Sequence, residues 1–179
     1  VQLPGVTRGR AWTRGAVDGV ALSWGTPQTQ AWLLRPAGHT GPDLPAILLL
    51  HGHDGLKFYG KEKVADGPDG IAAGTAALRT RGYDGRSVAE GLVEAGFAVL
   101  VHDVFPWGSR RVDWHDFPAR AQRAGLAFEN GSERYEAAAR EHEHGLAKTA
   151  VLRNMPLAGT ILREDLLALA VLRATAGID

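Results

Sequence analysis

A run of five apolar residues at positions 46–50, Ala-Ile-Leu-Leu-Leu, constrains this chain most, because it ends abruptly in His51-Gly52-His53-Asp54-Gly55. A short unbroken apolar run bounded by turn residues is typical of a strand that is buried on both faces. Open α/β sheets place their chemistry where such strands end, and glycines let backbone N–H groups turn toward a ligand there. The sequence therefore predicts a buried strand followed by a binding loop.

The flanking patterns predict further strands and helices around this strand. Residues 17–24 and 30–34 indicate two strands joined by a Gly-Thr-Pro turn at 25–27, which favours a hairpin. Ser87 resembles the N-cap of a helix that ends at Gly96, and residues 97–101 form a second apolar run. Strand, helix and strand in this order predict an α/β fold with parallel strands and crossover helices.

The two ends of the chain differ in character. Residues 1–15 are polar and arginine-rich, and we expect a surface arm there; residues 104–159 are expected to form a helical excursion or lid, with Ser132 capping a helix that runs toward Leu152. From about position 160 a strongly amphipathic helix is expected. Its apolar face consists of Leu162, Leu166, Leu169 and Leu172.

Composition excludes several functional classes. Lys plus Arg and Asp plus Glu both number 20, so the formal charge is zero and the usual signature of a nucleic-acid binder is missing. No apolar run reaches the roughly 18–20 residues of a membrane span. The chain contains no cysteine, so it offers no disulfide, zinc–thiolate site or cysteine nucleophile. We expect a cytoplasmic protein without a cofactor, although a mature secreted chain also fits.

Three stretches together resemble the α/β-hydrolase superfamily, in its dienelactone-hydrolase-like and acetyl-xylan-esterase-like bacterial branch. They are His51-Gly52-His53-Asp54-Gly55-Leu56-Lys57-Phe58-Tyr59-Gly60-Lys61-Glu62-Lys63, Val99-Leu100-Val101-His102-Asp103-Val104-Phe105-Pro106-Trp107-Gly108-Ser109-Arg110-Arg111, and Glu141-His142-Glu143-His144. In that superfamily an apolar strand ends in a His-Gly loop that supplies one N–H of the oxyanion hole. The resemblance implies an esterase-like activity on a small-molecule ester.

The nucleophile that this resemblance implies is missing from the sequence. No Gly-x-Ser-x-Gly is present, and the sequence around Ser87 lacks the buried strand that such a turn needs before it. The base and its acidic partner would follow the nucleophile in chain order. We therefore interpret residues 1–179 as one incomplete domain, the amino-terminal half of an α/β-hydrolase sheet. The remaining carboxyl-terminal half would be its partner, and the chain alone is expected to be inactive.

The candidate site lies at the carboxyl ends of the two apolar strands. The resemblance assigns the backbone N–H of His53 to the oxyanion hole, and it implies that Asp103 holds the turn that follows it. For positions 57–63 a solvated run of charges is the simpler interpretation. Candidate substrate-binding residues surround the loop: His51, Asp54, Lys57, Tyr59, Trp107, Arg110 and Arg111.

Two other functions stay open at this point. The chain could be a non-catalytic scaffold or binding domain that kept the fold without the triad. It could also be a metal-assisted hydrolase that uses His51, His53 and Asp54, although the pattern lacks the second pair of ligands that such sites show. A homo-oligomer is compatible with either.

Overall fold

The computed structural model describes residues 3–179 and shows a mixed α/β fold, which confirms the expected class. Five strands and five helices carry the architecture. They are β1 (Val6–Arg14), β2 (Val17–Trp24), β3 (Thr29–Pro36), β4 (Ala46–Leu49), α1 (Ala76–Gly82), α2 (Val88–Glu94), β5 (Ala98–His102), α3 (Ala119–Gly125), α4 (Gly131–Leu152) and α5 (Leu157–Arg173).

The strands form one sheet in the order β1-β2-β3-β5-β4. The first four in this order pair antiparallel, so the expected hairpin of β2 and β3 is present, and β5 then pairs parallel with β4. The prediction of a surface arm at residues 1–15 is wrong for Val6–Arg14, which pair with β2 as an exposed outer strand. Its polar side chains concealed a strand because most of them face solvent. Residues 1–2 of the expected arm lie outside the described part.

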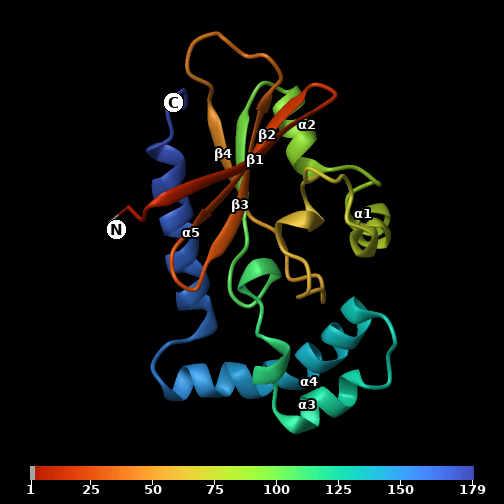
Figure 1. Ribbon diagram of the computed structural model, residues 1–179. Coiled ribbons are helices and arrows are strands. Elements are labelled where there is room, and N and C mark those ends of the chain that lie inside the picture. The colour runs from red at the N-terminus through yellow and green to blue at the C-terminus, as the bar shows by residue number, and fades with distance from the viewer. Residues whose placement is uncertain (1–2) are drawn as a thin grey trace.

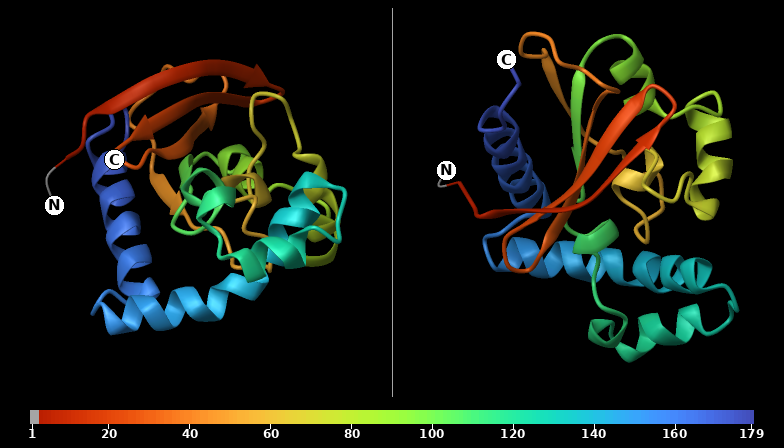
Figure 2. Two further views of the ribbon diagram at one scale, coloured as in Figure 1. Left: turned by 60° about the horizontal axis from the view of Figure 1, so that its bottom comes forward. Right: turned by 45° about the horizontal axis from the view of Figure 1, so that its top comes forward.

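Helices cover both faces of the sheet. Figure 1 shows α5 on one side and α2 on the other, with α3 and α4 beyond the end of the sheet where β5 finishes. Two apolar clusters fill the layers: one joins α2 to Leu34, Val99 and Val101, and the other joins α5 to Leu33 and Leu100. Because β4 and β5 run parallel, the loops that follow them emerge at the same edge of the sheet, facing α4 (Figure 2).

The two predicted helix caps have different outcomes. The Oγ of Ser87 accepts a hydrogen bond from the backbone N–H of Glu90, which confirms the predicted N-cap of α2. The predicted cap at Ser132 is wrong, because α4 begins at Gly131 and its N-cap is Asn130, whose side chain accepts the N–H of Ser132. Asparagine and serine are both favourable N-caps, so the pattern alone did not separate the two positions.

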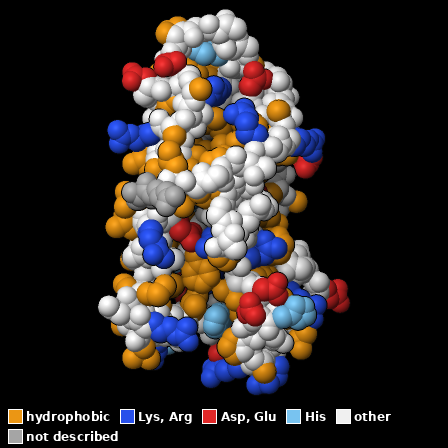
Figure 3. Space-filling model, turned by 60° about the vertical axis from the view of Figure 1, so that its left-hand side comes forward, with side chains coloured by type: hydrophobic (Ala, Val, Ile, Leu, Met, Phe, Trp, Pro, Cys, Tyr) orange, Lys and Arg blue, Asp and Glu red, His pale blue; other side chains and the backbone are white. Residues whose placement is uncertain are grey.

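The leucine face of α5 does not face the core. Leu162, Leu166 and Leu169 are 58%, 45% and 37% exposed, whereas Ala168, Val171 and Leu172 are buried against the sheet. Of the four leucines predicted to line the apolar face, only Leu172 is buried in this way. Figure 3 brings this side of the molecule forward and shows apolar side chains gathered in patches along it.

Strand β4 lies at the edge of the sheet, so the prediction of a strand buried on both faces is wrong for it. All four of its residues are half-buried, while all five residues of β5 are buried. Within residues 3–179, no strand pairs with the outer edge of β4. An isolated parallel bridge joins Leu44, just before β4, to Ile178 near the end of the chain.

Candidate functional site

The loop at residues 51–55 leaves the carboxyl end of β4 and is held in place by Lys63. The Nζ of Lys63 donates to the carbonyl oxygens of Gly52, at 2.6 Å, and of His53, at 3.2 Å. Asp54 and Gly55 both have left-handed backbone conformations, with φ of 54° and 70°. The tight turn thus depends on a residue pair that tolerates positive φ.

His51 is a half-buried imidazole that is neutral at pH 7. Burial, aided by the charge of Lys63, lowers its pKa to about 4. Its Nδ1 lies 3.1 Å from the carbonyl oxygen of Gly52, and its ring meets that of Trp107 edge-on with centroids 5.9 Å apart. Its Nε2 is buried without a hydrogen-bond partner among the described residues. His51 therefore supports the loop from within.

The lysines at positions 57–63 are not solvated. Lys57, Lys61 and Lys63 are only 5%, 3% and 0% exposed, so the interpretation of this stretch as a solvated run of charges is wrong. Each ammonium has oxygen acceptors inside the fold, which is how a buried cation is tolerated. Composition could not reveal this, because two of the acceptors, Glu143 and Asp103, come from distant parts of the chain.

Asp103, just after β5, is a fully buried charged group, as Lys63 is. Its carboxylate accepts the backbone N–H groups of Lys61 and Ser109, each at 2.8 Å, and pairs with the Nζ of Lys61 at 2.9 Å. Burial opposes its ionisation, but the charge of Lys61 and these donors hold its pKa below the usual range. A Cβ at Gly60 or Gly108 would collide with this carboxylate. Asp103 thus holds the following turn, as expected from the sequence.

Two glutamates of α4 reach across to the loop. Glu136 accepts the backbone N–H groups of Lys57, at 2.8 Å, and Phe58, at 2.6 Å. Glu143 lies 2.7 Å from the Nε2 of His53 and 2.9 Å from the Nζ of Lys57. Burial opposes ionisation of Glu143, but the hydrogen bonds from His53 and Lys57 keep its pKa lowered. The helix is therefore fastened to the loop at two points.

The sequence patterns did not reveal Glu136, the contacts that Glu143 makes with the loop or the part played by Lys63. Glu136 and Glu143 are separated by about two helical turns, which places them on the same face of α4. That spacing was a usable signal, but nothing in the sequence showed which segment the face would meet. In the stretch Glu141-His142-Glu143-His144, His142 packs edge-on against Phe117.

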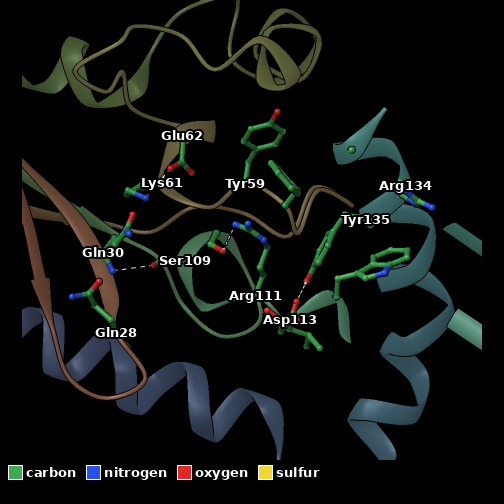
Figure 4. Close-up of a pocket in the computed structure, with 15 residues that line it drawn as sticks. Gln28, Gln30, Tyr59, Lys61, Glu62, Ser109, Arg111, Asp113, Arg134 and Tyr135 are labelled. Atoms are coloured by element: carbon green, nitrogen blue, oxygen red, sulfur yellow. Dashed lines mark hydrogen bonds and ion pairs between the residues drawn. The ribbon is translucent and has the colours of Figure 1, made fainter. Parts of the chain in front are cut away.

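Two of the predicted substrate-binding residues line a cavity beside residues 58–62. Tyr59 and Arg111 both contribute to a space of about 780 Å³ between the start of β3 and the start of α4 (Figure 4). The guanidinium of Arg111 stacks over the Phe58 ring, 4.5 Å from its centroid. This contact holds a cation at the wall of the cavity.

The other predicted substrate-binding residues belong to the loop and its support. The Nε1 of Trp107 donates to the carbonyl oxygen of His53 at 3.3 Å. Arg110 is turned away from the loop and pairs with Glu164 of α5 at 2.7 Å. Of the remaining predicted residues, His51 and Asp54 belong to the loop, and Lys57 contacts the His53 imidazole.

The serines nearest to these strands have structural contacts. The hydroxyl of Ser87 donates to the carbonyl oxygen of Val64, and that of Ser109 accepts the N–H of Gln30. Neither contact brings a histidine to the hydroxyl, as activation of a serine nucleophile requires.

The metal hypothesis for His51, His53 and Asp54 is contradicted by their geometry. Within residues 3–179, no group of three His, Asp or Glu side chains is arranged to hold an ion. The three side chains turn instead toward the Gly52 carbonyl, Glu143 and Lys63 respectively. Ligands that diverge in this way cannot share one tetrahedral ion.

Comparison with known proteins describes the fold. No protein-family model matches the sequence, and no curated protein matches it significantly. The crystal structure of a proposed acetyl xylan esterase from Bacteroides fragilis is similar, with a TM-score of 0.68 and 15% sequence identity. The likeness covers 99% of this chain and 40% of the esterase chain. This chain therefore has an α/β fold similar to that of the Bacteroides fragilis protein and spans less than half of its length.

In the described part of the chain, no helix is both long and apolar enough to cross a membrane.

Proposed function

We propose that this chain supplies the oxyanion-hole loop of a serine hydrolase that cleaves a carboxylic ester or a related acyl bond. The observation that carries the proposal is the loop at residues 51–55, which is built at the carboxyl end of β4 with the His53 N–H lacking an acceptor among residues 3–179. A backbone N–H aimed at a developing oxyanion contributes roughly 3–4 kcal/mol to transition-state stabilisation.

The nucleophile, base and acid would come from a segment that pairs with the free edge of β4. Three features support this part of the proposal: the half-buried β4, the exposed leucines of α5 and the parallel bridge between Leu44 and Ile178. A strand that continued this bridge would run parallel to β4. Its carboxyl end would then reach the same sheet edge as the loop, where a nucleophile must lie.

The substrate would be a small-molecule ester whose remote part occupies the cavity that residues 58–62 help to line. Tyr59 and Arg111 line this cavity from two different loops, and Tyr135 lines it from α4. A volume of about 780 Å³ falls in the range of small-molecule sites. The similar structure is described as that of a proposed acetyl xylan esterase, and an ester of a short acyl group is accordingly the first substrate to test.

The test compares the chain alone with the chain completed by the remaining half, using a simple aryl ester. The chain alone should associate or precipitate, because an open strand edge invites pairing, and should show no turnover. Co-expression with a chain that carries the remaining strands should restore solubility and activity. A monodisperse chain that hydrolyses the ester by itself would contradict the proposal.

In the completed enzyme, His53→Pro removes the backbone donor and should lower turnover at least about a hundredfold, the scale of one lost oxyanion donor. His53→Ala keeps the N–H and should cost much less. Circular dichroism checks that both variants fold. Equal losses in both folded variants would assign the effect to the imidazole and its contact with Glu143.

The alternative is a non-catalytic scaffold. The structural contacts of Ser87 and Ser109 favour it over an enzyme complete in this chain. The same co-expression experiment separates the two functions. If the completed protein is soluble but hydrolyses no aryl ester, whatever the length of its acyl group, the result would support the non-catalytic scaffold.

A further inference from the structure

We propose that Lys63 is a positioning residue: its ammonium holds the carbonyl groups of Gly52 and His53 and thereby turns the N–H groups of His53 and Asp54 to the opposite side of the loop, as a pair of donors. This inference rests on the proposed function, and it adds a second donor, Asp54, and the group that orients both.

Lys63 is buried and is hydrogen-bonded to the loop backbone. Its side chain is fully buried, and its Nζ reaches two successive carbonyl oxygens, of Gly52 at 2.6 Å and of His53 at 3.2 Å. Hydrogen bonds from a charged donor are roughly twice as strong as neutral ones. The carboxylate of Asp54 lies 3.7 Å from the same Nζ, so the cation is partly balanced within the loop.

Peptide planarity converts this contact into a direction for the N–H groups. In a trans peptide the C=O of one residue and the N–H of the next point in opposite directions. When the carbonyl groups of Gly52 and His53 face Lys63, the N–H groups of His53 and Asp54 face away from it. Neither N–H has an acceptor among residues 3–179, as an anion-binding pair requires.

Other contacts hold the same peptide in place. The carbonyl oxygen of His53 also accepts the indole N–H of Trp107 and the backbone N–H of Leu56, each at 3.3 Å. The Nζ atoms of Lys57 and Lys63 lie equally far, 5.6 Å, from the Trp107 ring. However, Lys63 donates to the loop carbonyl oxygens, whereas Lys57 pairs with the carboxylate of Glu143 and, within the loop, lies only near the imidazole Nε2 of His53, at 3.5 Å. Lys57 reaches no loop carbonyl group, which makes it a matched comparison for the effect on the backbone.

The ammonium group of Lys63 loses its proton at a pH not far above neutral. Burial lowers the pKa of its ammonium to about 8, against the opposing effects of Asp54 and Glu136, and Lys57 adds to the lowering. His51 also faces it and stays neutral at this pH, because its own pKa is about 4. Raising the pH through 8 therefore weakens the hold on the loop without any substitution.

The test measures the backbone order of the loop by 15N relaxation in the completed, soluble protein. In Lys63→Met the order parameters of the His53 and Asp54 amides should fall from rigid values of about 0.85 to below about 0.6. In Lys57→Met they should stay in the rigid range. Unchanged order in a folded Lys63→Met variant would overturn the inference.

A second measurement does not depend on the folding of a variant. In the unsubstituted protein the His53 and Asp54 amide shifts should follow the titration of Lys63, which is read from the shift of its own side chain and is expected near pH 8. Amide shifts that stay constant while Lys63 titrates would overturn the inference.

A kinetic measurement then separates the inference from the proposed function. In the completed enzyme, Lys63→Met should lower kcat about a hundredfold, the scale of one oxyanion donor, with KM nearly unchanged. Loss of loop order without loss of kcat would contradict the proposed function while leaving the role of Lys63 in the loop intact.

Discussion

Strands β4 and β5 are neighbours in the sheet with similar apolar sequences, yet they occupy different environments. β5 pairs on both sides and all five of its residues are buried, whereas β4 pairs only with β5 in the described chain and all four of its residues are half-buried. An apolar run therefore indicates a strand that can be buried, not the neighbours it will have. The difference also separates the two loops that follow, because Asp103 lies in a closed interior and Asp54 turns at an open edge.

The largest expected difference is between the losses of unfolding free energy when these two aspartates are substituted. Asp103→Asn leaves the buried Lys61 without its main partner and should cost about 3–5 kcal/mol of unfolding free energy. Asp54→Asn should cost less than about 1 kcal/mol, since its contact with Lys63 is long and partly exposed. Urea denaturation measures both. Similar losses would show that the two strand ends are equally closed.

A second comparison uses Leu100 of β5 and Leu48 of β4, which are direct partners in the ladder and face the same cluster. Leu100→Ala should destabilise the chain by about 2–5 kcal/mol, as at other fully buried positions. Leu48→Ala should cost about half as much, because a half-exposed side chain has less transfer free energy to lose. Denaturation of both variants checks the difference. If a partner segment covers β4, the loss at Leu48 should rise toward that at Leu100 in the completed protein.

A third comparison is a pH dependence with opposite signs at two places in the fold. His51, after β4, stays neutral in the fold down to about pH 4, so the stability it provides is present above pH 6.5 and is lost as the pH falls from 6.5 toward 4. Glu90, on α2, has its pKa raised by burial to about 7, so the stability it provides is present below pH 4.5 and is lost as the pH rises toward 7.

Denaturation of Glu90→Gln and His51→Gln across pH 4–7 separates the two groups. Glu90→Gln should gain stability relative to the parent as the pH rises. His51→Gln should lose the acid sensitivity between pH 6.5 and 4. Parallel stability curves for parent and variant would show that the corresponding side chain has the same pKa in the folded and unfolded states.

The sequence predicted the elements that depend on local patterns. The hairpin, the two parallel strands, the capped helix α2 and the helices after residue 104 all follow from periodicity, turns and caps. It could not predict features that depend on distant partners. The lysines are buried because Asp103, Glu143 and loop carbonyl groups meet them, and β4 is an edge because nothing in the described chain pairs with its outer side.

The two glutamates of α4 have a mechanical consequence. Glu136 and Glu143 bind the segment from His53 to Phe58 at two points, so α4 is held against this segment rather than free to move away from it. Any displacement of this helix large enough to open the cavity beside it must break these contacts together. Access to the cavity and order in the loop at residues 51–55 would then be a single equilibrium, shared between a helix and a turn that lie about 80–90 residues apart in the chain.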